Sequence, residues 1–386
     1  MDNPNVSAPL QLYVHIPFCE KKCHYCDFAS WELPASRQRP WTETLLREME
    51  IRGQGLEKRA VRTVFFGGGT PSVLAPEFLE ALVLALRSRF DCSKVEEWTI
   101  ECNPSSLNRA KLSALKELGF TRVSLGVQSF DAGELKRLGR VHSPEGAHAA
   151  LRALAEFGHF AFSGDLIFGQ PEQSLASFLQ SLETMLTYDP SHVSFYGLTI
   201  EAGTEFDRLA HAGRLRLPDP EAYNAQYLAG VEFLAERGYQ RYEVSNFAKP
   251  GLACRHNQGY WNEVEYLALG PGAHSLLAGN RMEAPRGFEE YLQWGADGFP
   301  LSSCGLDVLD GDSRLAERIF LSLRQAQGLD IQALCRDFQI VIPAPTLDKW
   351  LKAGMLEKSG NQVKLIGEGW LLLDEIASDL LAKIAA

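Results

Sequence analysis

The chain has 386 residues, 45% of them hydrophobic and 23% charged, which is typical of a soluble globular protein with one large domain and a smaller one. Asp and Glu outnumber Lys and Arg by 49 to 38, which gives a net charge of −11. Because nucleic-acid binding depends on cationic side chains that neutralise phosphates, this balance disfavours a nucleic-acid partner.

The N-terminus and the apolar runs carry no membrane signal. Residues 1–5 lack the basic and apolar regions of a signal peptide, and no apolar run approaches the roughly 20 residues needed to cross a bilayer. Eight cysteines are too sparse for a disulfide framework in a chain of this length. We therefore expect a cytoplasmic protein without a transmembrane segment.

Short β-rich runs alternate with amphipathic helical patterns through the first half of the chain. The candidate strands are Leu10–Ile16, Val61–Phe66, Trp98–Cys102, Arg122–Val127, Phe160–Phe168 and His192–Leu198. The helical segments between them include Trp41–Gly53, Pro76–Arg89, Asn108–Leu118, Pro144–Phe157 and Leu175–Leu186. Strand followed by helix, six times over, predicts a parallel sheet with right-handed crossovers, as a barrel or an open wound sheet.

The first candidate strand leads into three cysteines, Cys19, Cys23 and Cys26, at CxxxCxxC spacing. Three thiolates so close together can hold one face of an inorganic cluster, whereas a tetrahedral zinc site would need a fourth ligand and none stands nearby. Cubane iron–sulfur clusters normally take one cysteine per iron, so three cysteines leave one iron open to a small molecule. A zinc site with a distant fourth ligand and free core thiols are the alternatives.

Glycine and polar residues follow the ends of the later strands. Residues 67–69 are three glycines after the second strand, and they permit close approach of a ligand to the backbone. Glu101 and Gln128 end the third and fourth strands, and Asp165 interrupts the apolar fifth. Active sites of β/α barrels lie at the carboxyl ends of the strands, so these segments are predicted to converge with the cysteine loop on one mouth.

The cysteine loop after a strand ending in HIPFC resembles the radical S-adenosylmethionine (SAM) superfamily, in which SAM chelates the open iron of a [4Fe-4S] cluster. More of the chain resembles the oxygen-independent coproporphyrinogen III oxidase-like family, through LYVHIPFCEKKCHYCDF, VFFGGGTPS, IECNP, SLGVQSF, LGRVHS and GDLIFGQP. The resemblance implies that Cys19, Cys23 and Cys26 are the cluster ligands. The SAM contacts that it implies are Tyr13, Tyr25, Gly68, Gly69, Thr70, Glu101, Gln128, Arg140 and Asp165.

The fold that the pattern and the resemblance predict is α/β, a partial (β/α)6 radical-SAM barrel with a small helical, winged-helix-like C-terminal domain. We expect the barrel, with the cluster and SAM site, in residues 1–285 and the helical domain in residues 286–386. Helical patterns dominate after about residue 306, with a strand-like pair around 356–366. Winged-helix modules often bind DNA, but the net negative charge of this chain favours a role in protein interaction or in covering the barrel.

Two departures indicate a subgroup of this family. Phe28 stands where the oxidases carry a further cysteine, and only 12 residues precede Tyr13, where the oxidases have a long extension. Residues 255–261, RHNQGYW, resemble the HNxxYW signature of the haem chaperones in this family. That likeness implies haem binding, with an imidazole as axial ligand and flat aromatic faces against the porphyrin. The implied haem residues are His256, Asn257, Tyr260 and Trp261.

The resemblance therefore implies a haem chaperone that carries a [4Fe-4S] cluster and an exchangeable SAM and passes haem to acceptor haemoproteins. Acceptors at a membrane surface and a homodimeric state are compatible with it. Two alternatives stay open: a coproporphyrinogen III oxidase that decarboxylates propionates, and another radical-SAM enzyme such as an aromatic-ring methyltransferase. We expect no coproporphyrinogen oxidase activity.

Overall fold

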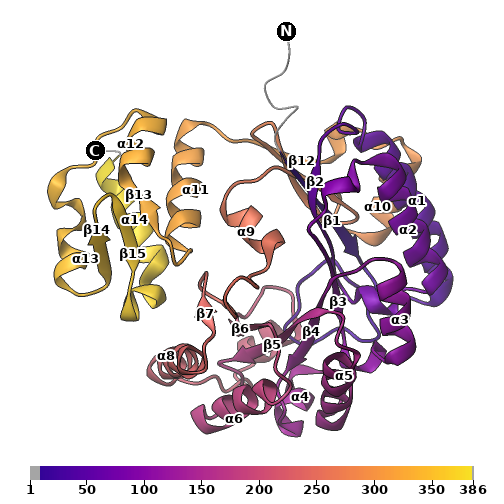
Figure 1. Ribbon diagram of the computed structural model, residues 1–386, viewed down its shortest axis with the longest axis horizontal. Helices are drawn as coiled ribbons and strands as arrows, with labels where there is room; N and C mark the ends of the chain where they lie inside the picture. Colours follow the sequence, from indigo (N-terminus) through magenta and orange to yellow (C-terminus); the bar gives the residue numbers. More distant parts are fainter. Residues whose placement is uncertain (1–8, 385–386) are drawn as a thin grey trace.

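Strands β1 to β6 run parallel and lie side by side in the order of the sequence, at the centre of one large curved sheet (Figure 1). The structure is a computed structural model and describes residues 9–384. A helix follows each strand, and the sheet has two open edges, which confirms the predicted partial barrel. The strands are β1 (Leu10–Ile16), β2 (Val61–Gly68), β3 (Glu97–Cys102), β4 (Arg122–Gln128), β5 (Ala161–Phe168) and β6 (His192–Gly197).

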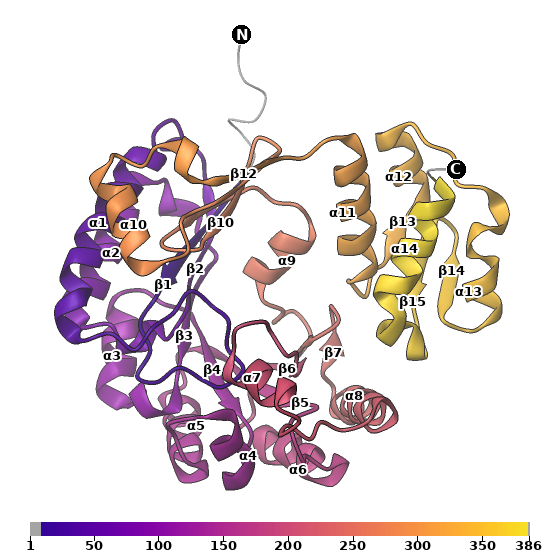
Figure 2. The same cartoon turned by 180° about the vertical axis from the view of Figure 1, so that it is seen from behind.

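Helices cover the outer face of this sheet (Figures 1 and 2). In α5, Pro144 suits the first turn because its backbone is already restricted, and the preceding Ser143 hydroxyl accepts the Gly146 N–H at 3.3 Å. The helix ends at Gly158, which adopts the left-handed conformation. The covering helices are α1 (Gln38–Arg52), α2 (Pro76–Arg89), α3 (Arg109–Glu117), α4 (Ala132–Leu138), α5 (Pro144–Phe157), α6 (Leu175–Leu186) and α8 (Pro220–Glu236).

The sheet extends beyond the six predicted strands on both sides. Beside β1 lie four further strands: β9 is parallel to β1, and β10, β11 and β12 each pair antiparallel with the strand before them. Beside β6 lie two short strands. No strand was predicted in these segments. The added strands are β7 (Gln240–Arg241), β8 (Asn246–Ala248), β9 (Tyr266–Leu269), β10 (His274–Leu277), β11 (Asn280–Glu283) and β12 (Gly305–Val308).

The large sheet therefore continues past residue 285, where its domain was expected to end. Strand β12 pairs with β11, and helix α10 (Phe288–Ala296) packs against α1. Both segments were assigned to the C-terminal domain from the sequence. We propose that the division lies between β12 and α11 instead.

The C-terminal part is helical, with a small three-stranded sheet in the order β13-β15-β14. It lies on the far side of the molecule from α1 and α2, and α9 (Arg255–Trp261) lies between it and the large sheet (Figures 1 and 2). No helix within residues 9–384 is long and apolar enough to span a bilayer. The elements are α11 (Gly311–Leu323), β13 (Leu329–Asp330), α12 (Ile331–Phe338), α13 (Asp348–Lys352), β14 (Leu356–Ser359), β15 (Gln362–Leu365) and α14 (Leu373–Ile384).

A buried charged network holds the added strands and α10 to the barrel. Glu48 of α1 is fully buried, lies 2.5 Å from Arg52, and accepts hydrogen bonds from the Tyr291 hydroxyl at 2.7 Å and the Gly270 N–H at 2.9 Å. Arg52 in turn donates to the Ala268 carbonyl at 2.9 Å. One carboxylate therefore connects α1, α10 and the loop after β9.

We predict that Glu48→Ala lowers the free energy of unfolding by about 3–5 kcal/mol, because it leaves a buried guanidinium without its carboxylate. The measurement is chemical denaturation of the purified protein. Glu43→Ala, an exposed position on the same helix, is the control and should change stability by less than about 0.5 kcal/mol. Equal effects of the two substitutions would contradict the role given to the network.

Candidate functional site

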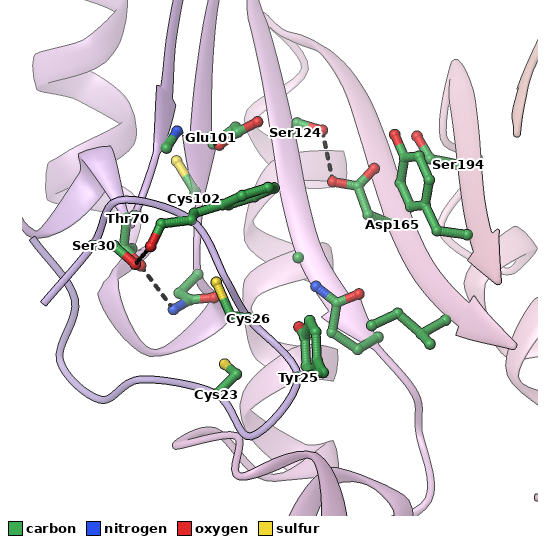
Figure 3. Close-up of a pocket in the computed structure, with 18 of the residues that line it drawn as sticks. Cys23, Tyr25, Cys26, Ser30, Thr70, Glu101, Cys102, Ser124, Asp165 and Ser194 are labelled. Carbon is green, nitrogen blue, oxygen red and sulfur yellow. Dashed lines mark hydrogen bonds between the residues drawn. The ribbon is translucent and has the colours of Figure 1, made fainter. Parts of the chain in front are cut away.

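A cavity of about 410 Å³ lies where the cysteine loop meets the carboxyl ends of the parallel strands (Figure 3). This is the convergence expected from the sequence. Tyr25, the three cysteines of the loop, and residues from β2 to β6 all line it. Of the predicted cofactor residues, the cavity wall contains Cys19, Cys23, Tyr25, Cys26, Gly68, Gly69, Thr70, Glu101, Gln128, Arg140, Asp165 and Asn257.

The cysteine loop is fixed by backbone hydrogen bonds. The Cys19 N–H donates to the Trp31 carbonyl at 3.0 Å, and the Cys26 N–H donates to the Cys23 carbonyl at 3.2 Å. Burial raises the pKa of Cys19 and of Cys26, and repulsion between neighbouring thiolates adds to both. Within residues 9–384, no three His, Cys, Asp or Glu side chains are placed to share one metal ion.

Two further cysteines line the same cavity. Cys102 ends β3, and Cys254 precedes α9; both are buried. The Cys254 thiol donates to Glu97 Oε1 at 3.4 Å. Burial raises the pKa of each thiol to about 12, which keeps both protonated.

The glycines at the end of β2 allow the chain to pass very close to β1. A Cβ on Gly68 would lie 2.6 Å from the His15 ring, and Gly68 also has a φ of +107°, which other residues rarely adopt. A Cβ on Gly69 would lie 2.7 Å from the Phe18 carbonyl oxygen. The Gly69 N–H donates to Ile16 O at 2.7 Å, so this close approach also ties β2 to the start of the cysteine loop.

Two carboxylates face the cavity from β3 and β5. Glu101 accepts the Gly68 N–H at 3.1 Å, and burial together with the charge of Asp165 raises its pKa to about 8. Asp165 accepts hydrogen bonds from Ser124 at 2.7 Å and Ser163 at 2.9 Å (Figure 3). Burial raises the pKa of Asp165 as well, although these hydroxyls oppose the shift. Both carboxyl groups line the cavity and can form hydrogen bonds with a hydroxyl-bearing ligand.

Arg140 lies between the cysteine loop and β4. It donates to the Cys23 sulfur at 3.4 Å, to the Gly126 carbonyl at 2.7 Å and to the Asn103 side chain. Gln128 lies at a register shift between β4 and β5 and has a φ of +68°. Such strained backbone is concentrated at functional sites, where the surrounding structure maintains it.

Several buried donors around this cavity lack a partner within the described chain. They are Arg140 Nε, Arg122 Nη2 and the Thr99 hydroxyl. An unpaired buried donor is costly, so these atoms are suited to a ligand that supplies acceptor oxygens. Together with three free thiols in one wall, the lining fits both a thiolate-bound cluster and a carboxylate-bearing cofactor.

Helix α9 (Arg255–Trp261) carries the predicted haem residues, and they face different surroundings. Asn257 lines the first cavity, and Tyr260 and Trp261 line a second one. His256 is fully buried: the Thr63 hydroxyl lies 2.7 Å from Nδ1, and the Tyr260 hydroxyl lies 2.9 Å from Nε2. Burial lowers its pKa to about 3. Both ring nitrogens are occupied, so an axial-ligand role for His256 does not fit this geometry.

The second cavity, of about 620 Å³, is bounded by the added strands, α9 and α11. Tyr13, an expected SAM contact, lines this cavity rather than the first. The two cavities adjoin, because Asp27, Phe28, Gly68 and Glu101 line both. Phe28 is 58% exposed and marks the rim between them.

Some residues of the site could be found only in the structure. Ser124, Ser163 and Ser194 surround Asp165, because Ser124 is paired in register with Ser163, and Asp165 with Ser194. Their signal in the sequence is weak, because each of them is a small polar residue within a mainly apolar strand. Asn103 and Ser124 lie within the stretches IECNP and SLGVQSF, but the sequence assigned no role to either of them or to Arg122.

Comparison with known proteins identifies the family. A family model described as the Radical SAM superfamily matches residues 13–185. The solved structure of coproporphyrinogen III oxidase (HemN) from Escherichia coli has the same fold, with a TM-score of 0.84 and 23% identity over 97% of this chain and 90% of that one.

Curated relatives are similar over nearly the whole length. The heme chaperone HemW of Synechocystis is 37% identical over 337 residues, 85% of this chain and 81% of that protein. HemW of Bacillus subtilis is 32% identical over 96% of this chain and 99% of that protein. The chain therefore belongs to the heme chaperone HemW family, within the radical SAM superfamily.

Proposed function

We propose that this protein is a haem chaperone that carries a [4Fe-4S] cluster on Cys19, Cys23 and Cys26 and an exchangeable SAM. The observation that carries the cofactor part is that the three thiols share one cavity with the glycines and carboxylates at the ends of the parallel strands. A cluster held by three cysteines offers an open iron, to which the amino and carboxylate groups of SAM bind.

Different residues around this cavity can bind different groups of SAM. Arg140 has an unpaired Nε and can donate to the carboxylate. Glu101 and Asp165 can accept from the ribose hydroxyls or the amino group. Gly68 and Gly69 leave room for the ligand to approach the backbone of β2.

Haem as cargo is supported by the relatives, which are heme chaperones by name. Acceptor haemoproteins, reached in the cytoplasm or at a membrane surface, are the partners that this function requires. Coproporphyrinogen oxidation is the alternative, and the oxidase with the same fold makes it the relevant comparison. Phe28 argues against it, because an exposed apolar ring occupies the rim where the oxidases of this family have a further thiol.

We predict that Cys19→Ala, Cys23→Ala and Cys26→Ala each abolish the cluster after anaerobic reconstitution, because each removes one of three ligands. Iron and sulfide content and the visible absorption spectrum provide the measurement. Cys102→Ala and Cys254→Ala are the matched controls inside the cavity, and Cys92→Ala, Cys304→Ala and Cys335→Ala are controls outside it. Loss of the cluster in a control would contradict the three-ligand assignment.

We predict that Arg140→Ala weakens SAM binding by about 1.5–3 kcal/mol, the scale of a hydrogen bond to a charged group. Because Arg140 also contacts Cys23, affinity should be measured by titration per assembled cluster. Arg109→Ala, at an exposed position in α3, should leave the affinity unchanged. An unaltered dissociation constant in Arg140→Ala would remove this residue from the SAM site.

We predict haem binding near one equivalent per chain, and no decarboxylation of coproporphyrinogen even with cluster and SAM in place. A decarboxylating enzyme must enclose the substrate propionate away from water, whereas here the rim of the site is open at Phe28. Parallel assays of haem absorbance and of porphyrin products separate the two functions. Steady formation of vinyl products would overturn the chaperone assignment.

A further inference from the structure

The second cavity brings together aromatic and cationic side chains from separate elements. Tyr260 and Trp261 come from α9, and Tyr266 comes from β9. Arg281 of β11 and Arg286, just before α10, also line it. A haem presents a flat apolar ring, two carboxylates and an iron. The aromatic faces suit the ring, and guanidinium groups are the side chains that best hold carboxylates.

The described residues contribute two histidines to this lining, and their environments differ. His15 is buried, with the Tyr13 hydroxyl 3.2 Å from Nδ1 and the Ala29 carbonyl 2.9 Å from Nε2. His274 of β10 has 51% of its side chain exposed, and Glu283 Oε1 of the paired strand β11 lies 3.6 Å from its Nε2. Imidazoles that bind metals commonly turn one nitrogen toward a carboxylate and offer the other to the metal.

We propose that His274 is the axial haem ligand of this chain, through Nδ1, and that the haem lies in the second cavity with its propionates toward Arg281 and Arg286. The inference rests on the proposed function, because it takes haem as the cargo. It assigns to β10, a strand outside the HNxxYW motif, the role that the sequence suggested for His256.

Competing iron ligands near this cavity are less suitable. His256 has both nitrogens in hydrogen bonds, and it lines neither cavity. Burial raises the pKa of Tyr260 and of Tyr266, so neither phenol gives a tyrosinate at neutral pH. His274 is the more exposed of the two histidines in this lining, with 51% of its side chain accessible.

The two arginines have partners but keep donors for a ligand. Arg281 bonds to Glu317 of α11, and Arg286 lies 3.1 Å from Asp27 Oδ2 at the end of the cysteine loop. Their side chains are 32% and 56% exposed, respectively. Because a guanidinium has five N–H donors, a propionate can bind beside the existing carboxylate.

The test is titration of the cluster-loaded protein and its variants with ferric haem, followed by absorption and electron paramagnetic resonance spectra. His274→Ala should weaken haem binding at least tenfold and shift the Soret band and the iron signal. Added imidazole should restore the wild-type spectrum, because the residue removed is a single ligand. Cluster content, measured on the same samples, shows that the variant is folded.

His211→Ala, an exposed histidine of α7 (Glu205–His211) outside both cavities, is the control and should bind haem normally. Arg286→Ala should weaken binding without moving the Soret band. His256→Ala should lower stability but keep the haem spectrum. An unchanged spectrum in His274→Ala, with a changed one in His256→Ala, would overturn this inference and leave the chaperone function standing. A wild-type protein that binds no haem would overturn both.

Discussion

The central constraint on this molecule is that β1 is paired along both edges and buried on both faces. It lies between β2 and β9, and Tyr13 is its least buried side chain. A strand in that position cannot shift its register without disturbing both neighbours. The cysteine loop leaves directly from its end, so the positions of Cys19 and of the loop are fixed by a strand that is paired on both sides and buried on both faces.

The same strand separates the chemistry of the two cavities. On the side of β2 and β3 the wall is made of thiols, carboxylates and backbone that suit a cluster and SAM. On the side of β9 and β10 it is made of aromatic rings, arginines and His274. Gly68 and Glu101 belong to both walls. A ligand in one cavity would therefore contact residues that also form the wall of the other cavity.

The sequence predicted the parallel core well, because long apolar strands and capped helices carry strong local signals. The bounds of β1, α2, α5 and α6 agree with the prediction. The strand pair predicted around residues 356–366 is present as β14 and β15, but β7 to β13 were missed, because they are two to four residues long and gain their stability from pairing with distant partners. His256 looked like a ligand because hydrogen-bond partners such as Thr63 are invisible in a motif. His274 lies in none of the motifs found in the sequence, and its place in the lining of the second cavity is visible only in the structure.

The seam between α11 and the barrel consists largely of charged contacts. Arg281 pairs with Glu317, Arg318 with Glu263, and Arg324 with Glu243. Polar interdomain contacts of this kind permit relative movement more readily than an apolar interface does. The pairs of Glu317 and Glu263 are partly exposed, so salt weakens them, because mobile ions screen exposed charges over about 8 Å at physiological ionic strength. A haem bound in the second cavity, as proposed above, would therefore lie beside a polar interface, because Arg281 and Glu317 of this seam also line that cavity.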